Sequence, residues 1–537
     1  MAPSARQTYR FARGLRRLVR RPVAPEAARA TVTAERAARS DRFLRSLDAL
    51  VWPTLRSPLR LLLANAGLER GDVERLIGEH GLDGALEVLR DAGVYVAYEE
   101  YQGTQPARRG SASFDFSPPD FFNPATTADY LASTGGSRGA GTPVELSFAY
   151  ERRQAVLRSL GFQASGMLGA PTSIWLPVFP SAAGFGAVIK AMGGGNRPER
   201  WFSQIGNRTA GVTAHKQQFN SLLPLLNTVA RTHVPLPEHV PTSDPDPVVA
   251  WLADALRREG RAAIAGYASS ITAAARRAAE RGVDLTGTVA YPASEPVTTA
   301  KLDTMRAAGM ATWPLYAFVP EGAIGMACPE LPTEEYHLWD HDLAVVSRRR
   351  TRDDGVPVDA FCWTSLSLEA PRVLLNVEND DYGEVRTDAE LCSCLIGQVG
   401  VRTRLGGIRG LSKVVAAGIS VPGEVFDRIT DEALPARIGG GPGDFQFVED
   451  EVDGGAVVSL RVHPDLGRVD EAAVLDVTTA ILGESDTGVL ATEVWRPAGT
   501  RRVVRAAPLQ TRAGKTLSYE RVRRPAAPTP VPQEMQK

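Results

Sequence analysis

The chain has 537 residues, of which 43% are hydrophobic and 7% aromatic, a composition typical of a folded protein with roughly two or three domains. Its 61 basic and 62 acidic residues give a formal net charge of −1, so overall charge does not favour nucleic-acid binding. No apolar run approaches the about 20 residues that a membrane span needs, and the N-terminus lacks the apolar segment of a secretory signal. We therefore expect a cytoplasmic protein without a membrane partner.

Residues 1–120 are predicted to form a helical N-terminal extension. The first 40 are rich in alanine and arginine, and no acid precedes Glu26. This pattern is typical of a frayed, solvated helix, which we favour, and also of a basic amphipathic arm that binds anionic lipid or a partner. From about residue 41 to 94, apolar residues recur at intervals of three and four, which predicts further helices.

Residues 121–407 are predicted to form a large α/β domain. Apolar segments such as "TSIWLPVFP" and "ATWPLYAFV" alternate with helical segments such as "VTTAKLDTMRAAG". Strands that alternate with helices favour a sheet covered by helices on both faces.

The pattern changes near residue 408, and residues 408–525 are predicted to form a small, mobile α+β domain. The segment "DFQFVEDEVDGGAVVSLRVHPDLG" predicts a hairpin, "VDEAAVLDVTTAILG" a helix and "GVLATEVWRP" a strand. Residues 526–537 are rich in proline and are expected to be disordered.

Two short stretches carry residues suited to phosphate chemistry. Consecutive glycines in "TGGSRG" let backbone N–H groups converge on an anion, yet such clusters are also typical of flexible surface loops. In "TRAGK", Lys515 is placed either to enter a site or to remain an exposed surface lysine. The glycine-rich residues are Thr134, Gly135, Gly136, Ser137, Arg138 and Gly139.

The cysteines are too few for a disulfide framework in a chain of this length. Cys328, His337, Cys392 and Cys394 offer three thiolates and one imidazole, which suit a tetrahedral Zn²⁺ ion. The alternative is three buried free cysteines and an unrelated histidine. Because four protein ligands leave no open position, zinc here would be structural. Cys362 remains outside this set.

Further motifs follow the glycine-rich stretch in a fixed order. They are "YPASEPVTTAKLDTMRAAGM", "LYAFVPEGAIGMAC", "NVENDDYGEV" and "GIRGLSKVVAAGISVPGEVF". Over roughly residues 120–520, the ordered set resembles the adenylate-forming (AMP-forming) acyl ligase superfamily. Within it, phenylacetate-CoA ligases and acyl-protein synthetases form the most similar branch. That branch carries a similar Cys, His, Cys-x-Cys set, which favours the zinc interpretation.

The resemblance implies ATP-dependent activation of a small carboxylic acid as an acyl-adenylate, with release of pyrophosphate. The acyl group would then pass to a thiol or amine acceptor such as CoA, a carrier protein or a small molecule. By this resemblance the glycine-rich loop holds pyrophosphate, Glu321 holds Mg²⁺ and Lys515 bridges carboxylate and phosphate oxygens. The other nucleotide-binding positions are Glu295, Tyr316, Asp381 and Arg409, with Lys413 near the hinge and Gly418 on the loop beyond it.

This sequence departs from three of the motifs of the resemblance. Arg138 replaces a hydroxyl residue in the glycine-rich loop, and Leu411 stands where an aspartate is usual. Glu321 lies one residue further from Tyr316 than in the family pattern, with Pro320 in the hydroxyl position. Three hypotheses therefore stand: a carboxylic-acid ligase, an enzyme of the same fold with another oxyanion or acceptor, and a catalytically inactive nucleotide-binding or scaffold protein.

Overall fold

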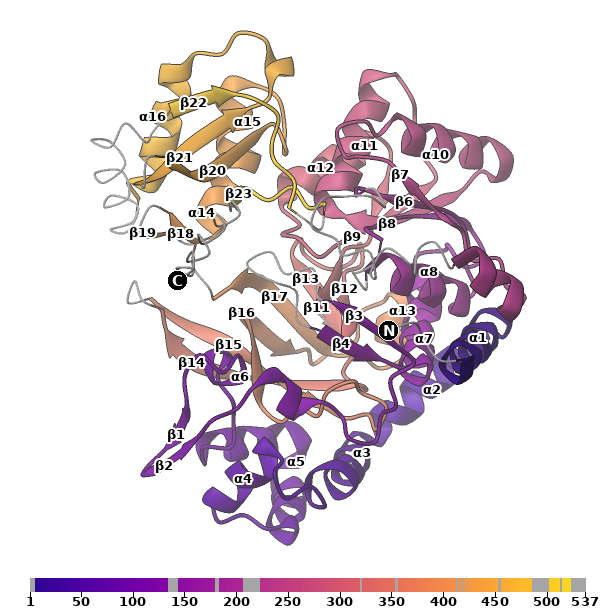
Figure 1. Cartoon of the computed structure of the whole chain (residues 1–537), viewed down its shortest axis with the longest axis vertical. Helices are drawn as coiled ribbons and strands as arrows, with labels where there is room; N and C mark the ends of the chain where they lie inside the picture. The colour runs from indigo at the N-terminus through magenta and orange to yellow at the C-terminus, as the bar shows by residue number, and fades with distance from the viewer. Residues whose placement is uncertain are drawn as a thin grey trace, which may run out of the picture. The chain divides into compact units, whose positions relative to one another are not determined.

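The computed structural model describes most of the chain. The described residues are 5–133, 143–178, 183–205, 223–318, 321–352, 356–411, 414–416, 419–421, 423–452, 455–484, 502–511 and 514–522. They divide into two compact units: Met1–Ser412 with Thr511–Lys515, and Lys413–Gln510 with Thr516–Lys537. The first is a large α/β unit and the second a small α+β unit, which confirms the predicted fold class (Figure 1).

The large unit contains a 13-stranded sheet in the order β14-β15-β16-β17-β13-β12-β11-β9-β8-β5-β6-β7, with β10 beside β9. From β11 to β7 the pairs are parallel, and from β14 to β11 they are antiparallel. The strands are β5 (Pro171–Trp175), β6 (Arg197–Ser203), β7 (Pro237–His239), β8 (Ala262–Tyr267), β9 (Thr288–Ala293), β10 (Ala311–Thr312), β11 (Leu315–Phe318), β12 (Gly322–Met326), β13 (Glu335–Leu338), β14 (Leu343–Thr351), β15 (Pro357–Ser365), β16 (Val377–Thr387) and β17 (Thr403–Gly410). The sequence-based boundary at residue 408 thus falls inside a strand of this sheet.

Strand order in the parallel half reverses between β5 and β8. From β5 the chain proceeds outward through β6 to β7, then returns to place β8 on the other side of β5, followed by β9. The carboxyl ends of β5 and β8 therefore flank a topological switch point. In open parallel sheets, ligands bind in the crevice outside such a point.

Helices cover both faces of the parallel half, as the alternating pattern predicts. Ile174 packs in one core cluster with Phe185 of α8, whereas its neighbour Trp175 packs in another with Val248 of α10. Successive side chains of a strand point to opposite faces, so each strand contributes to two cores. The helices of this half are α7 (Phe148–Ala164), α8 (Ala183–Gly193), α10 (Asp246–Glu259), α11 (Ala268–Glu280) and α12 (Thr299–Ala307).

The N-terminal helices belong to the large unit. They are α1 (Ala5–Arg20), α2 (Pro25–Ala37), α3 (Arg39–Ser46), η1 (Leu47–Val51), α4 (Pro58–Asn65), α5 (Arg70–Asp91) and α6 (Tyr98–Tyr101). Short elements complete the unit: β1 (Ala107–Arg109), β2 (Ala112–Phe114), η2 (Pro118–Phe121), β3 (Tyr130–Ser133), β4 (Pro143–Leu146) and α13 (Leu395–Gln398). Among the described residues, no helix combines the length and the apolar content needed to cross a bilayer.

Helix α1 packs against the core, so the expectation of a frayed, solvated helix is wrong. The ring of Phe11 lies 5.2 Å from that of Phe148 and 5.9 Å from that of Phe185 between centroids. A Cβ atom at Gly14 would come within 2.3 Å of the Phe148 ring, so glycine permits this close approach. The arginines occupy the opposite, exposed face, and they dominated the pattern on which the expectation rested.

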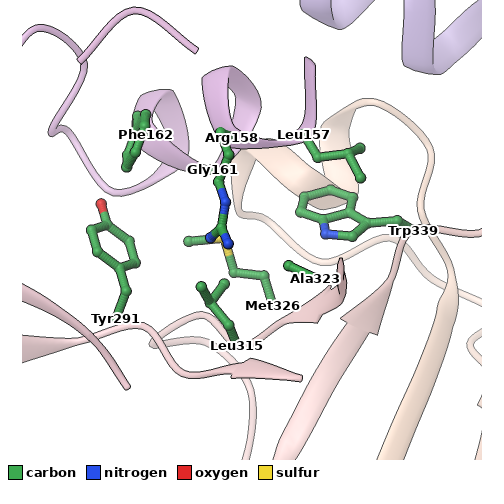
Figure 2. A pocket seen from close by; sticks show the side chains of 9 residues that line it. All are labelled: Leu157, Arg158, Gly161, Phe162, Tyr291, Leu315, Ala323, Met326 and Trp339. Atoms are coloured by element: carbon green, nitrogen blue, oxygen red, sulfur yellow. The ribbon is translucent and has the colours of Figure 1, made fainter. Parts of the chain in front are cut away.

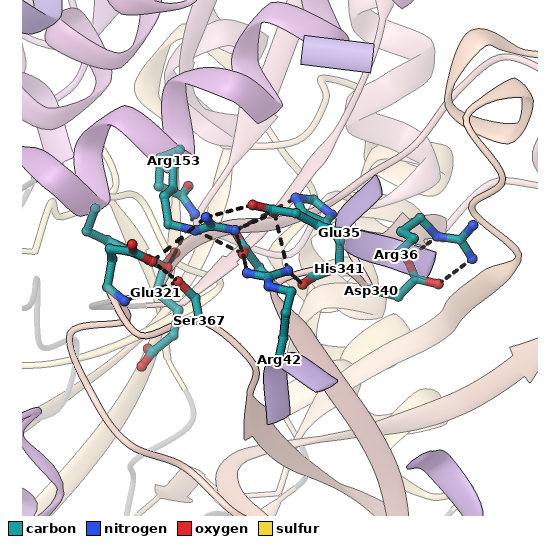
Figure 3. Close-up of polar contacts among 12 residues, drawn as sticks. Glu35, Arg36, Arg42, Arg153, Glu321, Asp340, His341 and Ser367 are labelled. Carbon is teal, nitrogen blue, oxygen red and sulfur yellow. Dashed lines mark hydrogen bonds and ion pairs between the residues drawn. The ribbon is translucent and has the colours of Figure 1, made fainter. Parts of the chain in front are cut away.

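A buried ion-pair network joins the N-terminal helices to the sheet (Figure 3). Arg153 of α7 binds both carboxylate oxygens of Glu35 on α2, at 3.0 and 2.6 Å, and also pairs with Asp342. Arg42 of α3 lies 3.2 Å from each of the same two carboxylates. Burial alone would raise the pKa of Asp342, but Arg153, His341 and Arg42 together outweigh it and hold that pKa well below its usual range. The network therefore pairs two carboxylates with two guanidinium groups from different elements.

The small unit contains a four-stranded sheet in the order β22-β21-β20-β23. The predicted hairpin is present as β20 (Phe445–Val452) paired with β21 (Gly455–Val462), and the predicted helix is α16 (Glu471–Leu482). The predicted strand at 488–497 and the tail at 526–537 lie outside the described residues. The other elements are β18 (Val414–Ala416), β19 (Ile419–Val421), α14 (Gly423–Asp427), η3 (Arg428–Ala433), α15 (Leu434–Ile438), η4 (Pro464–Leu466), β22 (Arg502–Arg505) and β23 (Tyr519–Arg521).

We expect Arg153→Met to lower the free energy of unfolding by about 3 kcal/mol at neutral pH, because it leaves buried carboxylates with one guanidinium in place of two. Urea titration measures this difference. Arg152→Met, on the exposed side of the same helix, is the matched control and should change stability little. The pKa of Asp342 is depressed in the folded state, so the stability from its ion pair is lost as the pH falls. The difference in free energy of unfolding between the wild type and Arg153→Met should therefore become smaller below about pH 4. An equal loss in both variants would contradict this prediction.

Candidate functional site

Lys515 lies at the carboxyl ends of the parallel strands, within the large unit. Its ammonium donates a hydrogen bond of 2.8 Å to the carbonyl oxygen of Ser294, the residue directly after β9. The same nitrogen lies 5.2 Å from the ring centroid of Tyr267, the last residue of β8. A lysine far along the sequence is thus held beside the switch point between β5 and β8.

Glu295 faces the same lysine and also caps a helix. Its two carboxylate oxygens accept hydrogen bonds from the backbone N–H of Ser269, at 2.7 Å, and from the Ser269 hydroxyl, at 2.9 Å, in the first turn of α11. Burial lowers the pKa of the Lys515 ammonium, while the negative charge of Glu295 opposes that shift. Burial likewise raises the pKa of Glu295. The positive charges of Lys301 and Lys515 and the hydrogen bonds from Ser269 oppose this rise. The two sequence-predicted residues therefore belong to one electrostatic unit.

Gly514 lets the lysine-bearing loop approach the sheet. Its φ angle is +76°, and a Cβ atom at this position would lie 2.4 Å from the Cβ atom of Gln204. Gln204 follows β6 and is itself fixed, because its side-chain amide donates to the carbonyl of Trp175 at 2.8 Å and to the Ser270 hydroxyl at 2.9 Å. A side chain at position 514 is therefore excluded both by conformation and by contact.

Tyr316 and Asp381, two further sequence-predicted residues, are brought together. The Tyr316 hydroxyl donates to the Asp381 carboxylate at 2.5 Å, and the Asn379 amide donates to the same oxygen at 2.9 Å. Burial, with the Asp381 charge beside it, raises the pKa of Tyr316 well above its ordinary value. Because Leu315 pairs with Ala293, this cluster begins on the strand next to β9.

Asn379 was not predicted from the sequence. It lies two residues before Asp381 at an irregular point of β16, where Asp380 has a φ angle of +76° and the backbone N–H of Asp381 donates to the Asn379 side chain. Arg409, on the neighbouring strand, pairs with Glu334 at 2.7 Å, and its strand position is opposite Tyr382. The predicted ribose-binding residues therefore lie on adjacent strands, β16 and β17.

Glu321 is buried and fully engaged by an arginine. Arg372 donates to its two carboxylate oxygens at 2.8 and 3.1 Å, and also donates to the Tyr101 hydroxyl. Burial raises the pKa of Glu321, and the adjacent guanidinium opposes the shift. Arg372 was missed from the sequence, because nothing local links an arginine to a glutamate 51 positions earlier.

The four predicted zinc ligands converge. The sulfur of Cys328 lies 3.4 Å from Nε2 of His337 and 3.8 Å from the sulfur of Cys392, and the sulfur of Cys394 lies 3.3 Å from the same Nε2. All four ligand atoms lie within 4.8 Å of one another. A tetrahedral zinc ion with bonds of about 2.3 Å to sulfur and 2.0 Å to nitrogen separates its ligand atoms by about 3.5–3.8 Å. The donor set and spacing therefore fit zinc.

A second group, formed by Glu35, His341 and Asp342, also brings three potential ligands together. Here the guanidinium groups of Arg42 and Arg153 contact the carboxylates, as described above. Because two guanidinium groups already pair with its carboxylates, we interpret this group as an ion-pair network and not as a metal site.

Several sequence-predicted residues lie outside the described part of the chain. They are the glycine-rich loop Thr134–Gly139, including Arg138, together with Pro320, Lys413 and Gly418. The strands before and after the loop are described: β3 pairs antiparallel with β4, with Ser133 opposite Pro143. Tyr130 of β3 packs in the same core cluster as Tyr267, the tyrosine beside Lys515.

No family model and no curated protein matches the chain. Solved structures do resemble it. A 2-hydroxyisobutyryl-CoA ligase in the postadenylation state is 13% identical, with 94% of this chain and 92% of that chain covered and a TM-score of 0.49. MatB from Rhodopseudomonas palustris, with ATP bound, is 13% identical, with coverage of 76% and 69% and a TM-score of 0.40. The anthranilate CoA ligase AuaEII, with anthranoyl-AMP, is 11% identical, with coverage of 81% and 74% and a TM-score of 0.41.

Two of these three structures are named as CoA ligases. At these identities and TM-scores the likeness carries no conclusion about this chain.

We expect Gly514→Ala to release Lys515 from its position at Ser294, because the added methyl group meets Gln204 and the backbone conformation becomes strained. Labelling with an amine-reactive ester, followed by peptide mass spectrometry, should show faster modification of Lys515 in the variant. Gly282→Ala is the matched control: its φ angle is +65° and no atom lies within 4 Å of the added group. Unchanged labelling in Gly514→Ala would show that this contact does not hold the lysine.

Proposed function

We propose that the protein is an AMP-forming ligase that activates a small carboxylic acid with ATP and passes the acyl group to a thiol or amine. The observation that carries this proposal is the hydrogen bond from Lys515 to Ser294, at the carboxyl ends of β8 and β9. A half-buried cation at a topological switch point is suited to binding anionic oxygens of a nucleotide. Phosphate-loop and ribose motifs in the expected order along the chain support the same reading.

The proposed reaction has two steps. A carboxylate oxygen of the acid attacks the α-phosphorus of ATP, the bond from that phosphorus to the bridging oxygen breaks, and pyrophosphate leaves. The acceptor then attacks the acyl carbon of the adenylate, and AMP leaves. Such phosphoryl chemistry depends mainly on alignment and on neutralisation of developing negative charge. CoA, a carrier protein and a small amine are the candidate acceptors.

In this proposal each described side chain has a task. Lys515 donates hydrogen bonds to carboxylate and α-phosphate oxygens, while Glu295 keeps the lysine protonated and oriented. Asp381 and Arg409 bind the ribose hydroxyls, and Tyr316 holds Asp381 and faces the adenylate. The carboxylate of Asp381 already accepts two hydrogen bonds, so its orientation is fixed before a ribose arrives.

The sequence resemblance implies that Glu321 holds Mg²⁺, but the surroundings of Glu321 do not fit a metal ion. Both oxygens of Glu321 are bound by Arg372, so the carboxylate offers no oxygen to an ion without losing a buried pair. We therefore assign no step of the reaction to a metal bound at Glu321.

The same ion pair favours a second candidate function. If Glu321 serves the structure alone, the protein binds a nucleotide without activating an acid and acts as a scaffold or sensor. The protein would then bind ATP in experiment but would show no acid-dependent catalysis.

Exchange of labelled pyrophosphate into ATP, measured against a panel of carboxylic acids, tests the ligase proposal. We expect acid-dependent exchange in the wild type and a loss of at least about 100-fold in Lys515→Ala, because an electrostatic contact to the transition state disappears. Lys515→Arg keeps the charge with another shape and should recover part of the rate. Calorimetric binding of ATP without exchange by any acid would favour the scaffold function, and absence of both would reject the two proposals.

We further propose that Cys328, His337, Cys392 and Cys394 hold a structural zinc ion. The donor set and the separations given above support this assignment. Four protein ligands leave no coordination position for a substrate, so the ion would stabilise the segment 392–394 against β12 and β13 and would take no part in chemistry.

Metal analysis should find one zinc ion per chain in the wild type and about none in Cys394→Ser, because a hydroxyl is a poor zinc ligand beside soft sulfur. The melting temperature should fall with it, since binding energy of the ion contributes to folding. Cys362→Ala is the control, because this thiol lies in a different core cluster and should leave the zinc content unchanged. A wild-type protein purified without zinc, in the absence of chelators, would contradict the assignment.

A further inference from the structure

The exposed face of α1 is a stripe of arginines. They recur at intervals of three and four residues, a spacing that places side chains on one face of a helix. The opposite face is apolar and buried, because Phe11 packs against Phe148 and Phe185 as described above. No acidic residue occurs in α1. The members of this arginine stripe, all exposed, are Arg13, Arg16, Arg17 and Arg20.

The charges of the arginine stripe are not neutralised by neighbouring carboxylates. Arg10, one turn nearer the N-terminus, pairs with Asp129 at 3.1 Å, which ends the stripe on that side. Within the described part of the chain, no carboxylate lies within ion-pair distance of a stripe arginine. Arg20 donates to the backbone carbonyl of Arg231 at 2.8 Å, and this acceptor carries no net charge. The stripe therefore presents its positive charges to its surroundings.

Helix α7 adds a further cation beside the stripe. Arg152 donates to the backbone carbonyl of Arg21, the residue that follows α1. Partial burial of the Arg152 side chain and the positive charge of Arg17 both lower its pKa, so the guanidinium groups of the two helices lie close enough to repel each other. The opposite side of α7 packs on the sheet, where Leu157 and Phe162 face the strands (Figure 2). Together with Arg21 and Arg152, the stripe forms what we call the basic face.

A helical segment at residues 223–230 lies alongside the carboxyl end of α1. Its buried side chain Leu226 shares a core cluster with Leu18. The hydrogen bond from Arg20 to the carbonyl of Arg231, directly after the segment, joins the two helices at the surface. The segment is therefore a fixed neighbour of the basic face.

Three aliphatic side chains of this region are exposed. Leu225 and Val229, one helical turn apart, are 56% and 50% exposed, and Leu236 before β7 is 51% exposed. Single exposed leucines are common on folded proteins, but these lie beside a set of cations that have no carboxylate partner among the described residues. We call them the apolar border of the basic face.

Guanidinium groups beside exposed aliphatic chains fit the surface of an anionic lipid bilayer. Clusters of about four to eight basic residues on an amphipathic helix attract acidic headgroups, and neighbouring aliphatic side chains enter the boundary between headgroups and acyl chains. Nucleic acid also attracts cations, but it is bound through polar contacts and aromatic stacking, to which leucine and valine add little. The observed combination therefore favours lipid over nucleic acid.

We propose that the basic face and its apolar border bind the anionic surface of a lipid bilayer. Peripheral attachment of this kind needs neither an apolar span nor a secretory signal, whose absence from the sequence led to the expectation of no membrane partner. The apolar face of α1 stays packed in the core, so its arginines bind headgroups, while Leu225 and Val229 supply the apolar contact. The inference goes beyond the ligase function and does not depend on it.

Sedimentation of the full chain with lipid vesicles tests this proposal. We expect binding to vesicles of equal parts phosphatidylserine and phosphatidylcholine, none to phosphatidylcholine alone, and release as ionic strength rises. Arg16→Gln combined with Arg17→Gln should weaken binding by about 25-fold, because each basic residue near an anionic surface contributes about fivefold. Arg257→Gln combined with Arg306→Gln removes the same charge from α10 and α12 and is the matched control, which should bind as the wild type does.

Two further variants separate the contributions of charge and apolar contact. Leu225→Ser combined with Val229→Ser should weaken binding several-fold, whereas Leu55→Ser, at a leucine that is 71% exposed elsewhere, should not. Arg16→Lys combined with Arg17→Lys keeps both charges and should bind as the wild type does. Thermal melting of each variant verifies its fold.

Equal binding to both kinds of vesicle, no binding to either, or an equal loss in the Arg16/Arg17 and Arg257/Arg306 glutamine substitutions would overturn the proposal. Retention on double-stranded DNA without binding to vesicles would also overturn it and would assign the basic face to nucleic acid.

Discussion

The parallel pairing of β5 with β8 is the constraint on which the candidate site depends. It places the carboxyl ends of β5 and β8 side by side, although β6 and β7 lie between these two strands in the sequence. Residues that follow β6, β8 and β9 meet there, and they include Gln204, Ser269 and Ser294. A loop from far along the sequence then adds Lys515 to this edge. The backbone arrangement thus assembles a polar site that no single segment contains.

Buried charge is the second theme of the large unit. Arg153 matches Asp342 and Glu35, Arg372 matches Glu321, and Lys190 matches Glu151. In each case an ion that would be costly to bury alone is stabilised by a partner from another element. These pairs make the contacts between helices and sheet specific.

Much of the fold follows from sequence periodicity, but side-chain partnerships do not. The hairpin at 445–462 and helix α16 were predictable because their patterns are local. Helix α1 was misjudged, because its many arginines obscured an apolar face formed by Phe11, Leu15 and Leu18. Its amphipathic spacing was readable, but the ring partners that bury it come from later segments.

Some residues of the candidate site were likewise predictable from the sequence and others were not. The cysteine and histidine set was predictable because its residue types suggest one chemistry. Tyr316 and Asp381 were each predicted from a sequence motif. The hydrogen bond between their side chains is an observation that the motifs did not predict. Arg372 gave no local signal, since an arginine in a loop is ordinarily a surface residue. Its importance comes from the buried Glu321 that the fold places beside it.

The packing of α1 has a consequence for the synthesis of the chain. Phe11 leaves the ribosome before Phe148 and Phe185, which cover it, have been made. During that interval an apolar helix face with a basic reverse side has no native partner, a condition that invites binding by chaperones or anionic surfaces. Completion of α7 and α8 ends the interval. Helix α1 therefore reaches its native contacts only after α7 and α8 have been made.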